Sequence, residues 1–315
     1  MPVFQSPLTI MNCLFCGSQS LHLLYSGNFH PVAVWHGPFD FYRCNTCGSG
    51  LTLPLPEPAQ LIKLYESFEG GMIPGIRALR DQYPLTAWFH QCINRALKYS
   101  GKVISKESPF NWIDLGAGNG ELAILLANRF PNSNGIAVDF HDRPGELDLY
   151  PGIKWIKTDM NQVDFMDHFA DKKARFVFSI TVLEHLLRPD QFVEKALDIS
   201  GKPGCLYLTT PMMNSDAFYL LGKNWPYFLP GEHLNIPSLK GMRVMLERIC
   251  REKFDKGSWS VNVKPVILPY PIGYYSKYLK LGKIGDIIPN KWVLRLPTGL
   301  LEAAVILSDD NQRIN

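Results

Sequence analysis

The stretch from Asn111 to Glu121, NWIDLGAGNGE, constrains the fold more than any other part of the sequence. An apolar strand leads into three glycines at alternate positions, and a helical sequence follows at 122–129. Glycine has no Cβ, so this turn can take left-handed dihedral angles and lets the backbone approach a ligand closely. A strand, a tight glycine turn and a helix in this order are typical of nucleotide sites in α/β sheets.

Two acidic residues sharpen this interpretation. Asp114 lies just before the glycine turn, and Asp139 ends the next apolar run, residues 135–139. A carboxylate at the second position can accept hydrogen bonds from both ribose hydroxyls of an adenosine. The alternative is a surface aspartate that merely ends a strand, but the glycine turn at this spacing favours a nucleotide site.

The order of apolar segments predicts an α/β fold with a parallel sheet covered on both faces. We expect strands at 110–115, 135–139, 153–157, 175–180 and 205–210, and helices at 85–99, 120–130, 189–200 and 238–254. A sixth strand is predicted at 259–268 and a last, antiparallel strand at 301–307, with one short helix and a loop between 269 and 297. Ligands of such sheets bind at the carboxyl ends of the strands, where Asp114, Asp139, Asp159 and Ser179 lie.

The run Asp114–Gly120 resembles the first motif of class I S-adenosylmethionine-dependent methyltransferases. Leu183-Glu184-His185 resembles a signature of the ubiquinone-biosynthesis-like branch of that family. The resemblance implies a Rossmann-like, seven-stranded sheet of order 3-2-1-4-5-7-6, in which Asp139 holds the ribose and residues 158–160 hold the adenine. The cofactor-binding residues that it implies are Asp114, Gly116, Ala117, Gly118, Gly120, Asp139, Phe140, Asp159, Met160 and Ser179.

Near the start of the chain, Cys13-Leu-Phe-Cys16 and Cys44-Asn-Thr-Cys47 are near-copies, each followed by Gly-Ser. Each turn can present two thiolates to one metal, and two such turns predict a closed, four-cysteine zinc site of structural type. Two disulfides in a secreted protein are the first alternative, and a redox pair is the second. The remaining unpaired cysteines argue against the first, and the duplication of the motif argues against the second.

These features divide the chain into three predicted parts. Residues 1–53 are expected to form a zinc ribbon, and residues 54–108 a proline-rich linker with an N-terminal helical segment. Residues 109–315 are expected to form the methyltransferase domain, with a lid or substrate segment at 212–240 that is rich in large side chains.

Methyl transfer needs an aligned acceptor and, for a protonated acceptor, a base. His233, with Glu232 as its partner, is the first candidate for the base, and His185 is the second. Trp225 followed by Glu232-His233-Leu234 resembles a pattern in methyltransferases that act on sugars and related small metabolites. The alternatives are that His233 caps the next helix and that His185 only orders its loop.

Composition limits the cellular context. A net charge of +3 is too small to indicate nucleic acid or an anionic membrane, and no apolar run reaches the roughly 20 residues of a membrane span. Without a recognisable secretory signal, a cytoplasmic protein is expected. Between Cys13 and Cys47 the only Lys or Arg is Arg43, which argues against a ribbon that binds nucleic acid. The sequence does not indicate an oligomeric state.

The sequence therefore predicts an S-adenosylmethionine-dependent methyltransferase that binds structural Zn²⁺. Its predicted substrate is a small polar metabolite, such as a sugar or sugar nucleotide methylated on oxygen or carbon. The alternatives are an RNA methyltransferase that uses the ribbon for recognition and a catalytically silent protein that keeps the fold for binding.

Overall fold

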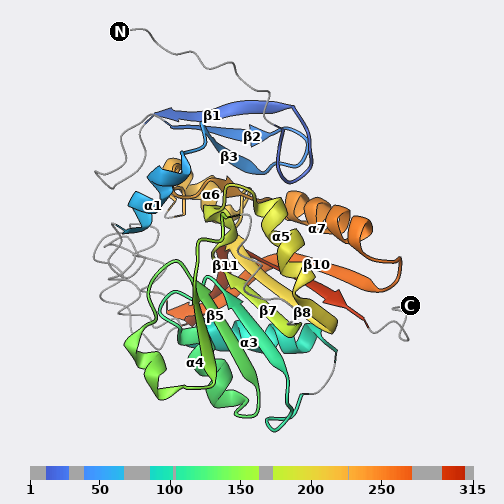
Figure 1. Ribbon diagram of the computed structural model, residues 1–315. Coiled ribbons are helices and arrows are strands. Elements are labelled where there is room, and N and C mark those ends of the chain that lie inside the picture. The colour runs from blue at the N-terminus through green and yellow to red at the C-terminus, as the bar shows by residue number, and fades with distance from the viewer. Residues whose placement is uncertain are drawn as a thin grey trace.

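A computed structural model of the chain describes residues 12–27, 39–66, 86–101, 104–162, 173–225, 227–271 and 293–308. The described elements form a large central sheet with helices on both faces and a smaller sheet at one end of the molecule (Figure 1). The smaller sheet comes mainly from the N-terminal part of the chain.

The central sheet has seven strands in the order β10-β11-β8-β7-β4-β5-β6. The strands are β4 (Asn111–Leu115), β5 (Asn134–Asp139), β6 (Ile153–Lys157), β7 (Ala174–Ile180), β8 (Ser200–Pro211), β10 (Trp259–Pro271) and β11 (Val293–Leu307). Neighbours from β6 to β8 pair in parallel, and β11 pairs antiparallel to both β8 and β10. This arrangement confirms the predicted seven-stranded α/β fold and its strand order.

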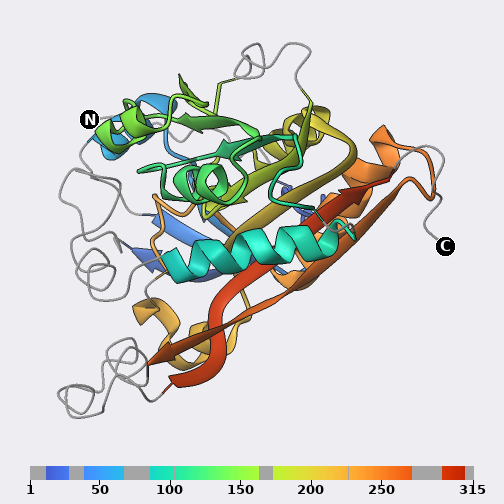
Figure 2. The same ribbon diagram turned by 90° about the horizontal axis from the view of Figure 1, so that it is seen from below.

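Helices α3 (Thr86–Tyr99) and α4 (Glu121–Arg129) cover one face of the central sheet. Apolar residues of α3 recur at helical spacing, so Trp88, Cys92 and Ala96 all point into the core shared with α4. Figure 2 shows α3 crossing the long strand β11 from this side.

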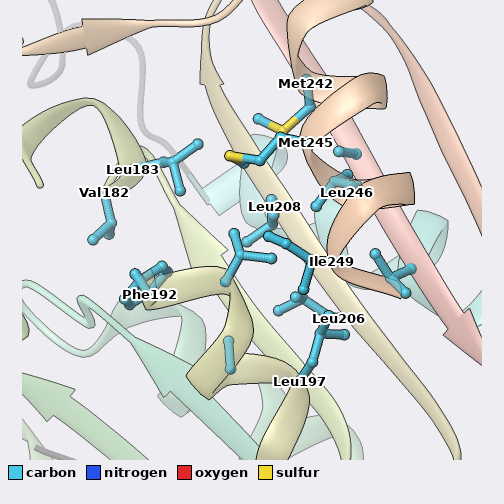
Figure 3. Packing of buried hydrophobic residues seen from close by; sticks show 14 of the residues in the cluster. Val182, Leu183, Phe192, Leu197, Leu206, Leu208, Met242, Met245, Leu246 and Ile249 are labelled. Carbon is cyan, nitrogen blue, oxygen red and sulfur yellow. The ribbon is translucent and has the colours of Figure 1, made fainter. Parts of the chain in front are cut away.

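Helices α5 (Pro189–Asp198) and α7 (Leu239–Lys253) cover the opposite face. One face of α7 is apolar and fully buried, because its methionine, leucine and isoleucine residues recur every three or four positions. Figure 3 shows this face meeting β8 and α5; the labelled side chains are Met242, Met245, Leu246 and Ile249 of α7, Leu206 and Leu208 of β8, and Phe192 and Leu197 of α5.

The smaller sheet has the order β1-β2-β3-β9 and is antiparallel throughout. Its strands are β1 (Leu21–Gly27), β2 (Phe39–Cys44), β3 (Gly50–Leu53) and β9 (Asn235–Ile236). The first three belong to the predicted ribbon, although β1 was not predicted as a strand. The fourth comes from the segment that follows the central strand β8, so the two sheets share a length of chain.

The remaining described elements are short: α1 (Pro58–Glu66), α6 (Asp216–Leu221), and the 3-10 helices η1 (Gly145–Leu149), η3 (Leu183–His185) and η4 (Gly222–Asn224). The segment 212–240 thus contains a helix, a 3-10 turn and strand β9, more regular structure than its composition suggested. None of the helices in the described ranges is long and apolar enough to cross a membrane.

The prediction of a short helix and a loop between 269 and 297 was wrong at both described ends. Strand β10 continues to Pro271, and β11 begins at Val293 and pairs with it. The error arose because cross-strand pairing over this length compensates for the prolines and glycine that interrupt the strand pattern. Residues 272–292, where the helix was predicted, lie outside the described residues.

Candidate active site

A cavity of about 180 Å³ opens at the carboxyl ends of the central parallel strands. Its walls come from the glycine turn after β4, from the residues that follow β5, β6 and β7, and from one residue before β9. The lining residues are Gly116, Gly118, Asp139, Phe140, His141, Asp159, Met160, Asn161, Thr181, Val182, His185, Leu186 and Glu232. The cavity therefore lies where open α/β sheets bind their ligands.

Asp139 joins the glycine turn to the end of β5. Its Oδ2 atom accepts a hydrogen bond of 2.7 Å from the Gly118 N–H, and its Oδ1 atom accepts one of 3.0 Å from the His141 N–H. The carboxylate is 8% exposed and reaches the cavity wall. Its two backbone donors hold it at the position where a ribose diol would meet a carboxylate.

Gly116 shows why the turn needs glycine. Its φ angle is +84°, and a Cβ there would lie 2.2 Å from Cγ2 of Val182, a residue that also lines the cavity. The first glycine thus lets the turn pack directly against the segment after β7. A ligand in the cavity would meet the backbone of Gly116 and Gly118 at close range.

Asp114 lies behind the cavity wall rather than on it. It is 1% exposed, and its Oδ2 atom has no hydrogen-bond partner within the described residues. Burial, and secondarily the Asp139 carboxylate, raise the pKa of Asp114 to about 8.

The other predicted cofactor residues divide into two groups. Phe140, Asp159 and Met160 line the cavity, as do Gly116, Gly118 and Asp139. Ala117, Gly120 and Ser179 do not line it. Gly120 is the N-cap of α4, and Ser179 lies on β7 with a buried Oγ that has no partner in the described part of the chain. Their assignment to the cofactor remains a prediction.

The two predicted histidines meet at the part of the cavity wall that follows β7. The rings of His185 and His233 have centroids 4.7 Å apart, and His185 lines the cavity whereas His233 is buried behind it. Nδ1 of His185 lies 3.2 Å from the Glu232 carbonyl, and Nδ1 of His233 lies 2.7 Å from the Tyr227 carbonyl. Because a carbonyl only accepts, each Nδ1 carries the hydrogen, and each neutral ring has its lone pair on Nε2.

A third group, Glu184, completes this cluster. Its side chain is fully buried, Thr210 Oγ1 donates a 2.9 Å hydrogen bond to one oxygen, and the other oxygen lies 3.9 Å from His185 Nε2. Burial raises the pKa of Glu184. One ligand atom from each of Glu184, His185 and His233 lies within 4.8 Å of the others. Such a set suits proton transfer and could also hold a divalent cation.

Glu232 was predicted to orient His233. Its carbonyl contacts His185, and the residue lines the cavity, while the Tyr227 carbonyl faces Nδ1 of His233. A backbone group therefore orients His233 at Nδ1, and a role of the Glu232 side chain stays a prediction. Tyr227 gave no sequence signal for this role, because any residue type offers the same carbonyl.

Sequence reasoning also missed five cavity residues, of which His141, Asn161 and Thr181 have polar side chains. His141 follows Asp139 by two positions and places its Nδ1 2.9 Å from the Asp139 carboxylate. Asn161 accepts a hydrogen bond from the Leu187 N–H, which ties the end of β6 to the segment after η3. Thr181 has a φ angle of +56°, a strained value for a β-branched residue, at the point where β7 ends. The position of His141 and Thr181 just after strand ends was the available signal.

The four predicted metal ligands form one cluster at the edge of the smaller sheet. Sγ of Cys13 lies 3.6 Å from Sγ of Cys47, and Sγ of Cys16 lies 3.6 Å from Sγ of Cys44. All four are free thiols, and the ligand atoms lie within 4.8 Å of one another. Four thiolates bound tetrahedrally at about 2.3 Å from Zn²⁺ would be about 3.8 Å apart, so the donors fit zinc.

The electrostatics of the cluster favour metal binding. The Cys13 thiol, within hydrogen-bond reach, lowers the pKa of Cys47 to about 5, while the same contact and burial raise the pKa of Cys13. Burial raises the pKa of Cys16 to about 11. Sulfurs this close cannot all ionise without a cation to neutralise them, and a divalent metal supplies that charge.

Comparison with known families assigns the chain to a class. A family described as a methyltransferase domain matches residues 85–249, which is more than half of the 315-residue chain. The chain belongs to this family, and with the seven-stranded fold and the cavity at its carboxyl edge it is a class I S-adenosylmethionine-dependent methyltransferase.

Solved structures support the same fold. The plantazolicin methyltransferase BpumL in complex with SAH is similar with a TM-score of 0.53 and 14% identity over 79% of this chain and 94% of that chain. The plantazolicin methyltransferase BamL, bound to a triazolic desmethylPZN analog and SAH, gives 0.51 and 12% over 81% and 92%. A search of curated proteins found no match. At these identities the structures show a shared fold and nothing about the acceptor.

Proposed function

We propose that this methyltransferase transfers the methyl group of S-adenosylmethionine to oxygen or carbon of a small polar metabolite, such as a sugar or sugar nucleotide. The observation that carries the proposal is the contact of His233 with His185, which lines the same cavity as Asp139. A neutral imidazole with its lone pair on Nε2 is a suitable base for a hydroxyl or an activated C–H group.

In this proposal the two ends of the cavity have separate tasks. Asp139 and the backbone of the glycine turn hold the adenosine part of the cofactor. Phe140, Asp159 and Met160 lie beside its adenine ring. The cofactor supplies an electrophilic methyl group. As the acceptor atom takes the methyl, its proton moves to Nε2 of His185, the ring that lines the cavity, while the Glu232 carbonyl holds the hydrogen of this ring on Nδ1.

We also propose that Cys13, Cys16, Cys44 and Cys47 hold a structural Zn²⁺. Four thiolate ligands fill the tetrahedral shell and leave no open position for substrate, so the ion would stabilise the ribbon rather than act in catalysis. The residues of the ribbon form little apolar core of their own, and in such small domains metal binding supplies much of the free energy of folding.

The first test is calorimetric titration of the zinc-loaded protein with S-adenosylmethionine. We expect saturable binding, and its loss in Asp139→Ala. Asp142→Ala is the matched control, because Asp142 is 88% exposed and pairs with Lys157 outside the cavity. Failure of the unchanged protein to bind the cofactor, in the presence of candidate acceptors as well as alone, would refute the proposed reaction.

The second test identifies the acceptor. Sugars and sugar nucleotides are incubated with the protein and cofactor, and S-adenosylhomocysteine formation is followed by mass spectrometry. His185→Ala and His233→Ala should retain cofactor binding and lose turnover, by about 10²–10⁴-fold for the residue that acts as the base. Full turnover in both variants would exclude the histidine pair as the base.

A further inference from the structure

Strand β3 of the ribbon is hydrogen-bonded to the segment that carries His233. The Thr52 N–H donates to the Leu234 carbonyl at 2.8 Å, and Thr52 Oγ1 donates to the His233 carbonyl at 2.9 Å. Beyond these bonds, β3 pairs with β9, with Gly50 opposite Ile236 and Leu51 opposite Asn235. The ribbon therefore holds both the backbone of His233 and the residues that follow it.

The same segment is bonded on its other side to η3, which carries His185. The Leu234 N–H donates to the Glu184 carbonyl at 2.7 Å, and the Asn235 side-chain amide donates to the Leu186 carbonyl at 2.6 Å. The Glu232 carbonyl faces His185 Nδ1, as described above. Residues 232–235 are thus fixed between the ribbon and η3, and a shift of this segment would move the rings of both His185 and His233.

A second line of polar contacts continues this interface toward the cysteine cluster. The Ser238 N–H donates to Ser49 Oγ at 3.1 Å, and Ser238 Oγ donates to the Cys47 carbonyl. Lys240 Nζ donates to the Thr46 carbonyl at 2.8 Å. These partners belong to the turn between Cys44 and β3, so the conformation of the metal-binding turn sets the position of the segment after β9.

The interface contains more buried polar groups than attachment alone requires. Thr52, Ser49 and Ser238 are at most 3% exposed, and each has a hydrogen bond across the interface. Apolar contact is already available, since the Phe41 ring meets Phe228 at 4.8 Å in an edge arrangement. A buried polar group without a hydrogen-bond partner destabilises the folded state. These groups therefore permit one register between the ribbon and residues 232–238, whereas two apolar surfaces could shift against each other.

We propose that Thr52 is a positioning residue of the acceptor half of the site. It acts through the backbone of residues 232–234, which sets the positions of the His233 and His185 rings. It also makes the positions of these rings depend on metal binding by the ribbon. This inference rests on the proposed catalytic role of the histidines, whereas the physical link itself is independent of that role. The ribbon is then part of the active-site architecture as well as a stabilising appendage.

The test is hydrogen–deuterium exchange with mass spectrometry on the full-length, zinc-loaded protein. Thr52→Val keeps the side-chain shape and removes the donor to His233. We expect exchange of the peptides covering 229–238 and 183–187 to become roughly two- to tenfold faster, as loss of one buried hydrogen bond implies. Exchange at 116–126 and the S-adenosylmethionine affinity should stay unchanged, and Thr52→Ser, which keeps a hydroxyl, should restore the slow exchange.

Thr46→Val is the matched control. Thr46 Oγ1 donates to Ser18 Oγ within the exposed part of the ribbon, so this variant loses one ribbon hydrogen bond of the same type away from residues 232–235. It should leave exchange at 229–238 unchanged. Chelation of the metal should accelerate hydrogen exchange in the same two peptides as Thr52→Val does, and to a greater extent.

Three results would overturn the inference: unchanged exchange in Thr52→Val, equal acceleration in Thr46→Val, or failure of Thr52→Ser to restore protection. The acceptor found by screening adds a functional readout, in which Thr52→Val should lower kcat and leave the KM for S-adenosylmethionine unchanged. A protein that binds no cofactor would refute the proposed reaction, and the exchange data would still decide the role of Thr52.

Discussion

The two ends of the cavity are built in different ways. The end that we propose to hold the cofactor takes its residues from successive strand ends between Gly116 and Asn161, in the order of the chain. The acceptor end combines η3 with Glu232 and His233, held in turn by Thr52, which is 181 residues away from His233 in the sequence. The first end is formed by one continuous stretch of strands and turns. The second end forms only when segments far apart in the sequence come together.

This difference indicates which end of the cavity can change without affecting the other end. The glycine turn and Asp139 are positioned by the central sheet, whose strands pair over many residues. The histidine pair depends on short contacts with a small sheet and on a four-cysteine cluster. We therefore expect changes in the ribbon to affect the acceptor end and to leave cofactor binding intact, and the following predictions test this separation.

The largest effect is expected from Cys44→Ser. Removing one ligand of a closed four-thiolate site forfeits binding free energy that is on the order of 10 kcal/mol in small zinc domains, so the ribbon should unfold. Metal analysis should fall from one zinc per chain toward none, while calorimetry still detects S-adenosylmethionine binding.

Cys250→Ala is the control for this loss, because Cys250 is buried in α7 away from the cluster and its variant should keep its zinc. Retention of one zinc per chain by Cys44→Ser would contradict the assignment of the ligands. A second metal per chain in the unchanged protein would place a cation at Glu184, His185 and His233. Loss of cofactor binding together with the zinc would break the separation of the two halves.

The second prediction concerns Asp114 at the cofactor end. Its folded-state pKa of about 8 lies above the ordinary aspartate value of 3.8, so between these pH values the folded protein holds a proton that the unfolded chain has lost. Stability of the cofactor-free protein should therefore fall as pH rises from about 4 to 8. Asp114→Asn should remove this fall and gain on the order of 2–5 kcal/mol relative to the unchanged protein by pH 8.

Urea unfolding at pH 5, 6.5 and 8 measures this effect. Asp142→Asn, at an exposed position after β5, should give a profile parallel to that of the unchanged protein. Parallel profiles for Asp114→Asn as well would show that Asp114 does not titrate in this range.

A smaller effect is expected for Gly116→Ala. The new Cβ would collide with Val182 and require a left-handed dihedral angle, which together cost about 1–3 kcal/mol of stability. Because the turn must shift to relieve the contact, calorimetry should also show weaker S-adenosylmethionine binding.

Gly145→Ala is the matched control, since a Cβ there meets nothing within 4 Å and the backbone is not left-handed. Hydrogen exchange at 229–238 should remain unchanged in both glycine variants. Faster exchange there in Gly116→Ala alone would show that the two ends of the cavity are coupled.

The smallest effect compares two helix caps. Ser215 Oγ accepts from the Phe218 N–H of α6, and Ser238 Oγ accepts from the Gly241 N–H of α7 and also donates to the ribbon. Ser215→Ala should cost about 1 kcal/mol, and Ser238→Ala about 1–2 kcal/mol, in the free energy of unfolding. Only Ser238→Ala should speed exchange in the turn 44–50, and equal patterns in the two variants would argue against the contact between α7 and the ribbon.

The sequence alone determined the central sheet and most of the cofactor end. Alternating apolar segments predicted each parallel strand to within a few residues, because hydrophobic periodicity and glycine turns are local signals. The strand order followed from a resemblance. Gly116, Gly118, Asp139, Phe140, Asp159 and Met160 all line the cavity, and their binding of the cofactor stays a prediction. The four cysteines were identified in the same way, since two Cys-x-x-Cys turns carry their ligand geometry within four residues each.

Only the tertiary structure decided the acceptor end. His185 and His233 were candidates on separate grounds, and nothing in their spacing showed that their rings meet at 4.7 Å. The pairing of β3 with β9 and the hydrogen bonds of Thr52 join segments whose local sequences carry no mark of each other. The carbonyls of Tyr227 and Glu232 fix the histidine tautomers by their position alone, and position is set by packing rather than by residue type.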